Sequence, residues 1–167
     1  MVWLRLVHIL SGIFWVGSTV VIAAFLIPAA RASGVEGRRF VRRLMQGRGL
    51  GLALGLSMLL TVVSGFVMYG RLSAGFNRAW ATSRPGMALA VGALAALLAV
   101  VVGVGVTAPV GIRIERLQRR LEAASASPAP ADAARVAALQ SLLDRLTVVT
   151  ALLLIVAAAA MAVARYL

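Results

Sequence analysis

The sequence has no cysteine and no lysine, and its 167 residues include one histidine and only five acidic residues. Without cysteine, neither disulfides nor thiolate metal sites can form. No aspartate or glutamate falls within the long apolar stretches, so neither a pair of carboxylates nor a Ser-His-Asp set can be built there. The same absence argues against a proton relay or a carboxylate-coupled transporter. We therefore expect no catalytic residues, and the sequence favours a protein that is not an enzyme.

Apolar residues are abundant instead, at 62% of the chain with a mean hydropathy of +0.97. Soluble domains are nearer half apolar, so this composition indicates an integral membrane protein. Four stretches have about the 20 apolar residues needed to cross a bilayer, at about 2–28, 49–70, 86–108 and 146–164. The first is too long, and its positive leader too thin, for a signal peptide. We predict a single all-α membrane domain over residues 1–167, a four-transmembrane-helix bundle.

The net charge of +12 comes from seventeen arginines, which cluster in the connections between the apolar stretches. This placement indicates membrane orientation and anionic lipid, and not nucleic acid. The first and third connections each hold six arginines, whereas the second holds three and the N-terminus one. Positive residues favour the cytoplasmic side, so we predict a bacterial inner-membrane protein with both termini extracytoplasmic. Aromatic residues expected at the outer interface agree: Trp3, Tyr69, Phe76, Trp80 and Tyr166.

The first connection contains an amphipathic pattern over about 35–46, with Phe40 and Leu44 on one side of a helix. We interpret it as an interfacial helix, the alternative being a solvated basic loop. Its expected partners are anionic membrane lipids, bound through four arginines that lie largely on the other side: Arg38, Arg39, Arg42 and Arg43.

The third connection predicts a cytoplasmic helical hairpin over about 110–145, extending the bundle beyond the membrane. Glu115 and Arg119 are spaced to pair along one helix. Residues 125–132 read as a flexible linker, after which Asp132 is expected to cap the last helix. Pro109 is expected to kink or interrupt the third span near its inner end. Before that span, Ser83 is a predicted helix cap, with Pro85 in the first turn.

His8 lies within the first apolar stretch, where an ionisable group is a functional-site hypothesis by default. At helical spacing it shares a face with Ser11, Gly12 and Trp15, and we expect this face to point into the bundle. The second span carries a mildly polar stripe: Ser57, Thr61, Ser64 and Met68. Small residues predict close helix packing at Gly51-x-x-x-Gly55 and in the third span at Gly92, Ala96, Ala99 and Gly103.

Four residues are predicted to reach a common depth, each about one helical turn inside an arginine at the outer boundary. They are His8, Met68, Met87 and Met161. One imidazole and three thioethers suit copper(I), or a haem b with His and Met as axial ligands, and Trp15 is expected beside such a cofactor. The alternative is that the methionines fill gaps in the core and that His8 hydrogen-bonds a neighbouring helix.

A family resemblance follows from Leu6-Val7-His8-Ile9, Phe14-Trp15-Val16-Gly17 and Pro28. This opening helix resembles the "LHxxxxxxWxG" helix of the copper-resistance protein D family, the J-type membrane protoporphyrinogen oxidase and uncharacterised four-span relatives, with Val7 in place of the leucine. The later MYGRLS, RPG and TAP segments look most like the uncharacterised group. The resemblance implies a four-helix membrane bundle whose His8 ligates haem or copper.

The chain departs from the J-type oxidase because it has no lysine and no second histidine. The resemblance therefore does not carry oxidase activity, and one chain cannot supply two histidines to a haem. A haem bridging two copies of His8 in a homodimer stays open, as does membership of a larger membrane complex. We expect electron transfer or haem handling, with copper handling or a non-catalytic accessory subunit as the alternatives.

Overall fold

The computed structural model describes residues 1–46, 49–123 and 129–167, and every regular element within them is helical. Four continuous helices are long and apolar enough to cross a membrane: Val2–Ala32, Leu50–Leu72, Arg84–Leu121 and Pro130–Tyr166. The chain is therefore an all-α, multi-pass membrane protein with the predicted four spans, and no strand occurs in the described part.

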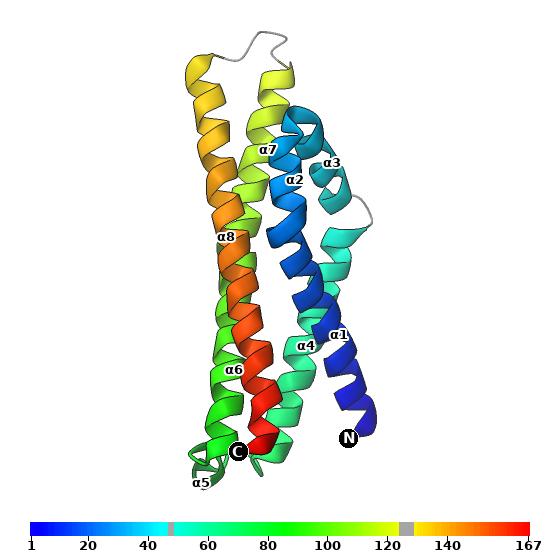
Figure 1. Cartoon of the computed structure of the whole chain (residues 1–167), viewed down its shortest axis with the longest axis vertical. Coiled ribbons are helices and arrows are strands. Elements are labelled where there is room, and N and C mark those ends of the chain that lie inside the picture. The colour runs from blue at the N-terminus through cyan, green and yellow to red at the C-terminus, as the bar shows by residue number, and fades with distance from the viewer. Residues whose placement is uncertain (47–48, 124–128) are drawn as a thin grey trace.

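The four spans form two tightly packed pairs that close into a bundle (Figure 1). Helix α1 (Val2–Val21) packs mainly on α4 (Leu50–Leu72), and α6 (Arg84–Val100) packs mainly on α8 (Pro130–Val163). Contacts of α1 with α8 and of α4 with α6 join the pairs. Both termini lie at one end of the bundle, and the opposite end carries the arginine-rich connections.

Two prolines lie inside continuous helices, and each is preceded by a π-helical segment. The segment η1 (Ile22–Leu26) leads into α2 (Ile27–Ala32) with Pro28, and η2 (Val101–Thr107) leads into α7 (Ala108–Ala123) with Pro109. A proline ring clashes with the carbonyl four residues earlier, and a widened turn relieves that clash without ending the helix. The first span therefore continues past Pro28, and Pro109 does not interrupt the third.

The shorter elements follow local signals in the sequence. The helix predicted over 35–46 is α3 (Gly34–Gln46), which packs on α2. Ser83 caps α6 as predicted, its hydroxyl accepting a hydrogen bond from the Gly86 amide at 3.3 Å. A one-turn helix, α5 (Arg78–Ala81), precedes it and is capped by Asn77.

The predicted hairpin at the arginine-rich end consists of α7 and the first part of α8, which pack on each other. The expected Glu115–Arg119 ion pair is present on α7. Helix α8 begins at Pro130 with Ala129 as its cap residue, so Asp132 lies in the first turn and does not cap the helix as expected. Residues 125–128 of the predicted linker lie outside the described part of the chain.

Small residues decide where the spans approach most closely. Ala99 is 1% exposed and Gly92 is buried, so these two residues of the predicted seam lie where α6 packs on α8. Gly103 has nothing within 4 Å of its Cβ direction, so the seam does not extend that far. A Cβ atom on Gly92 would lie 2.9 Å from Cγ of Met161. The seam predicted at Gly51-x-x-x-Gly55 was wrong, because Gly55 is exposed and has nothing within 4 Å of its Cβ direction.

Candidate functional site

His8 lies between α1 and α4, where Nδ1 of its ring is 2.9 Å from the carbonyl oxygen of Thr61 and 3.1 Å from Oγ of Ser64. The carbonyl oxygen can only accept a hydrogen bond. The Ser64 hydroxyl donates its single proton to a carbonyl of its own helix, that of Leu60 at 2.5 Å, so it too accepts from the ring. Both contacts therefore place a proton on Nδ1.

This protonation pattern leaves Nε2 of the neutral imidazole with an available lone pair. No residue of the described part hydrogen-bonds Nε2, and no buried side-chain nitrogen or oxygen there lacks a partner. Nε2 is therefore not fully buried. The ring is thus fixed through Nδ1, and Nε2 makes no hydrogen bond within the described residues.

The same interface carries further hydroxyl groups next to His8. The Thr61 hydroxyl lies within hydrogen-bonding distance of Ser11 Oγ, at 2.9 Å, and of the Ser57 carbonyl, at 2.7 Å. Ser11 in turn donates to the carbonyl of Val7 at 2.6 Å. The polar stripe predicted on the second span is thus the surface that meets the polar face of α1, and every hydroxyl proton has an acceptor.

Gly65 allows the His8 ring to lie against α4. A Cβ atom at this position would lie 2.9 Å from Cε1 of His8 and 3.3 Å from Nδ1. Separations below 3.0 Å are not tolerated, so any larger residue would displace the ring. The sequence reasoning missed Gly65, although it lies next to Ser64 of the predicted stripe.

Met68 belongs to the same interface as His8. It follows Ser64 by four residues and Thr61 by seven, so the three residues share one face of α4. The antiparallel alignment of α1 and α4 agrees with this position, because Arg71, about one turn after Met68 on α4, reaches Met1 Sδ at the start of α1 at 3.7 Å. Met68 therefore lies one turn from the His8 contacts, toward the end that carries the termini.

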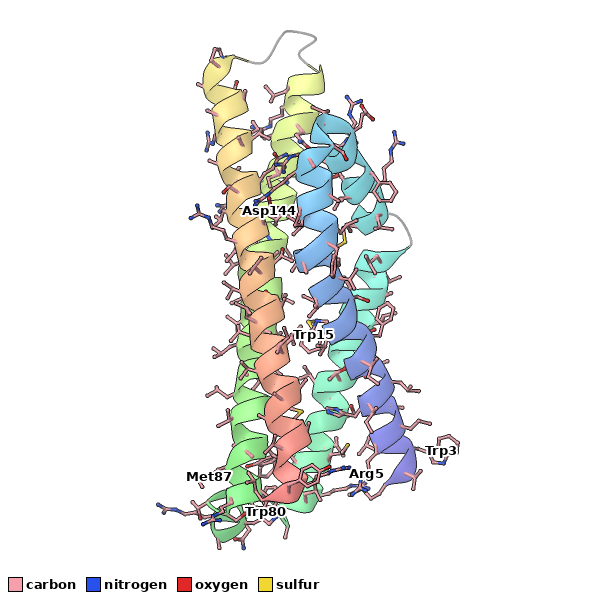
Figure 2. The ribbon with its side chains drawn as sticks, viewed as in Figure 1. Trp3, Arg5, Trp15, Trp80, Met87 and Asp144 are labelled. Carbon is pink, nitrogen blue, oxygen red and sulfur yellow. The ribbon has the colours of Figure 1, made fainter. Side chains whose placement is uncertain are left out.

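The other two methionines lie elsewhere. Met87 is 50% exposed and shares the outward face of α6 with three exposed residues, Val91, Leu94 and Leu98. Figure 2 shows it on the outer side of α6, away from α1. Met161 faces α6, where its side chain packs over Gly92. Met161 therefore packs in the other helix pair and Met87 faces outward, whereas Met68 shares a face of α4 with the residues that contact His8.

Trp15 occupies the centre of the bundle and is 5% exposed. It packs with Ala99 of α6 and Leu154 of α8, and partly buried residues of α4 surround it: Leu54, Met58 and Val62. It lies about two turns along α1 from His8, so its position is that of a packing residue that joins the two helix pairs.

No family model, no curated protein and no solved structure matches the chain. The resemblance to copper-resistance and haem-related membrane families therefore stays a prediction from the quoted motifs. Among the described residues, no group of three or more histidine, cysteine, aspartate or glutamate side chains could hold a metal ion.

An ion pair between Asp144 and Arg31 also joins two helices, and it was not predicted from the sequence. Arg31 Nε donates to Oδ2 of Asp144 at 2.7 Å, joining α2 to α8 near the arginine-rich end (Figure 2). The Asp144 side chain is 9% exposed, whereas that of Arg31 is 50% exposed. The carboxylate is thus buried against its partner, and the guanidinium reaches the surface.

Proposed function

We propose that the protein binds haem b through Nε2 of His8 and serves in electron transfer or haem handling. The observation that supports this is the fixed ring: Nδ1–H is donated to the Thr61 carbonyl, and Nε2 is not fully buried and is unpartnered among the described residues. Histidines that ligate metals commonly donate their other ring proton to a carbonyl, which sets the tautomer and the ring orientation. Bound haem would supply a one-electron couple whose potential its axial ligands tune.

Met68 and a second copy of the protein are the two sources that the sequence offers for another ligand to a bound haem. The chain has a single histidine, so two histidine ligands would require two copies of the protein. Of the three methionines predicted near His8, Met68 is the one on α4, four residues after Ser64, which contacts the His8 ring. Copper(I) handling is supported less, because Met87 faces outward and Met161 packs in the other helix pair. An accessory role, in which the basic end docks a partner, is the remaining alternative.

The proposed setting is the bacterial inner membrane, with the arginine-rich end in the cytoplasm and both termini outside. This orientation rests on the six arginines in each of the first and third connections. It would place His8 near the extracytoplasmic surface, within reach of a periplasmic redox partner or haem carrier.

Purified protein made with haem and copper available tests the proposal by its absorption spectrum and metal content. We expect a Soret band in the wild type that His8→Ala removes while the protein still inserts. Met68→Leu should shift the band or the reduction potential, whereas Met87→Leu, a methionine that faces outward, should leave both unchanged. Stoichiometric copper without haem would support copper handling in place of haem binding. A wild type that contains neither would end the ligand proposal and leave the accessory role.

A further inference from the structure

A groove runs along the outer surface of the first span at the arginine-rich half of the bundle. It has a volume of about 550 Å³ and lies between the first span, α3 and the start of α4. Phe14, Gly17, Val21 and Leu26 form one wall, and Phe40 and Leu44 of α3 form the other. Ligand sites commonly enclose roughly 300–1,000 Å³, so this groove is of a size that can hold a molecule.

The groove depends on a missing side chain. Gly17 lines the groove, and a Cβ atom there would have nothing within 4 Å, so a larger side chain at this position would project into the open space of the groove. The lining residues extend from Ile13 to Leu26, which is about 20 Å along a helix. One leaflet of a bilayer has a hydrocarbon thickness of about 15 Å, so the groove is slightly longer than a leaflet is deep.

The chemistry of the lining defines the shape of an occupant. Nearly all lining side chains are apolar, and Ser18 supplies the one hydroxyl among them. Water cannot fill an apolar groove that opens into hydrocarbon, because it would find no hydrogen-bond partners there. The groove therefore fits a narrow, extended apolar chain.

The positive charge next to the groove indicates which kind of lipid could supply such an acyl chain. Helix α3 carries four arginines and one glutamate, a net charge of +3. Glu36 pairs with Arg39, and Arg42 donates to the side-chain oxygen of Gln118 at 3.0 Å. Arg43 is exposed and follows Phe40 by three residues, so it borders the apolar face that forms the groove. In the part of the chain that the structure describes, Arg43 makes no ion pair.

We propose that this groove holds one acyl chain of an anionic phospholipid from the cytoplasmic leaflet, with the headgroup phosphate next to Arg43. The acyl chain lies between the first span and α3, and the arginines of α3 favour a headgroup with a net negative charge. The site therefore retains a defined lipid, beyond the general attraction of a basic helix to an anionic surface. The proposal does not involve His8 or any cofactor, and it takes from the proposed function only the orientation that puts α3 on the cytoplasmic side.

The test uses the full-length protein in bilayers of mixed phosphatidylglycerol and phosphatidylcholine, released gently for native mass spectrometry. We expect one retained phosphatidylglycerol per chain in the wild type. Gly17→Leu should fill the groove and remove the retained lipid. Gly55→Leu is the matched control, because Gly55 also has open space but does not line the groove, and it should retain the lipid. Arg43→Gln should weaken the preference for phosphatidylglycerol about fivefold, the factor expected for one arginine near an anionic surface.

Photocrosslinking supplies a second measurement that needs no variant. Phosphatidylglycerol with a photoreactive group in its acyl chain should label the peptide that contains Gly17 and the one that contains Phe40. Labelling no stronger there than at the exposed outer residues of α4, such as Leu52 and Leu56, would overturn the site. Retention of lipid by Gly17→Leu at the wild-type level would overturn it as well, and equal retention of phosphatidylcholine would overturn the choice of an anionic headgroup.

Discussion

Replacement of Gly65 by alanine is the sharpest test of how His8 is held. The added methyl group would lie 2.9 Å from Cε1 of His8, so the ring must move away from α4. Because the ring is also bonded to the Thr61 carbonyl at 2.9 Å, this movement lengthens the hydrogen bond that fixes its orientation. Gly55→Ala introduces the same methyl group on the same helix, where nothing lies within 4 Å.

The magnitude follows from comparing the two variants. Alanine is favoured over glycine within a helix by roughly 0.5–1 kcal/mol, and this gain is common to both positions. Only Gly65→Ala also weakens a hydrogen bond between membrane helices, worth about 0.6 and at most about 1.7 kcal/mol. Some further cost comes from the close contact itself. We therefore expect Gly65→Ala to be less stable than Gly55→Ala by about 1–2 kcal/mol.

Reversible unfolding in mixed detergent micelles measures this difference, with helix content followed by circular dichroism. If the protein binds haem, the spectrum should change in Gly65→Ala alone, because only there does the ligating ring move. Equal free energies of unfolding for the two variants would refute the packing of His8 on α4. Gly12→Ala supplies a further control, since its methyl group would meet Thr61 at 3.7 Å, an ordinary contact that should be tolerated.

Three further predictions concern the arginine-rich end and the topology. Arg31→Ala should destabilise the protein by about 3 kcal/mol because it leaves the buried carboxylate of Asp144 without its partner, whereas Asp144→Ala should cost about 1 kcal/mol. Equal losses of unfolding free energy in detergent would contradict this difference. A peptide spanning Gly34–Gln46 should gain more helicity with anionic vesicles than with neutral ones by circular dichroism, and an equal response would contradict an electrostatic role for its arginines. A reporter active only in the cytoplasm, fused after Leu167, should be silent, and strong activity would reverse the proposed orientation.

Features set by neighbours along the chain could be predicted from the sequence. The Ser83 cap and the Glu115–Arg119 pair depend on residues three or four positions apart, and both are present as expected. The effect of the prolines could not be predicted, because the rule that proline ends a helix omits the widened turn. The segments before Pro28 and Pro109 adopt that turn, and both helices continue.

Contacts between spans were harder to predict, for a reason specific to membranes. A lipid-facing surface is as apolar as a buried one, so the periodicity of apolar residues cannot show which residues of a span face lipid and which face another helix. Met87 was expected to face the bundle interior, yet it lies on an exposed face whose neighbours are equally apolar. Asp144 and Arg31 are 113 positions apart, and their pairing requires the helix to continue past Pro28. The polar stripe that contains Ser64 was visible, and a hydrogen bond from His8 to a neighbouring helix was one of three alternatives, but the sequence did not connect the two.

The two longest helices have a consequence for the geometry of any partner that approaches the basic end. The continuous helices Arg84–Leu121 and Pro130–Tyr166 contain 38 and 37 residues, so each is about 55 Å long. The hydrocarbon core of a bilayer is about 30 Å thick, which leaves about 25 Å of paired helix beyond it. A protein that binds this projection would be held at a fixed distance above the headgroups. If the spans tilt in the membrane, the projecting helices tilt with them, and the bound partner moves sideways by an amount that grows with its distance from the membrane.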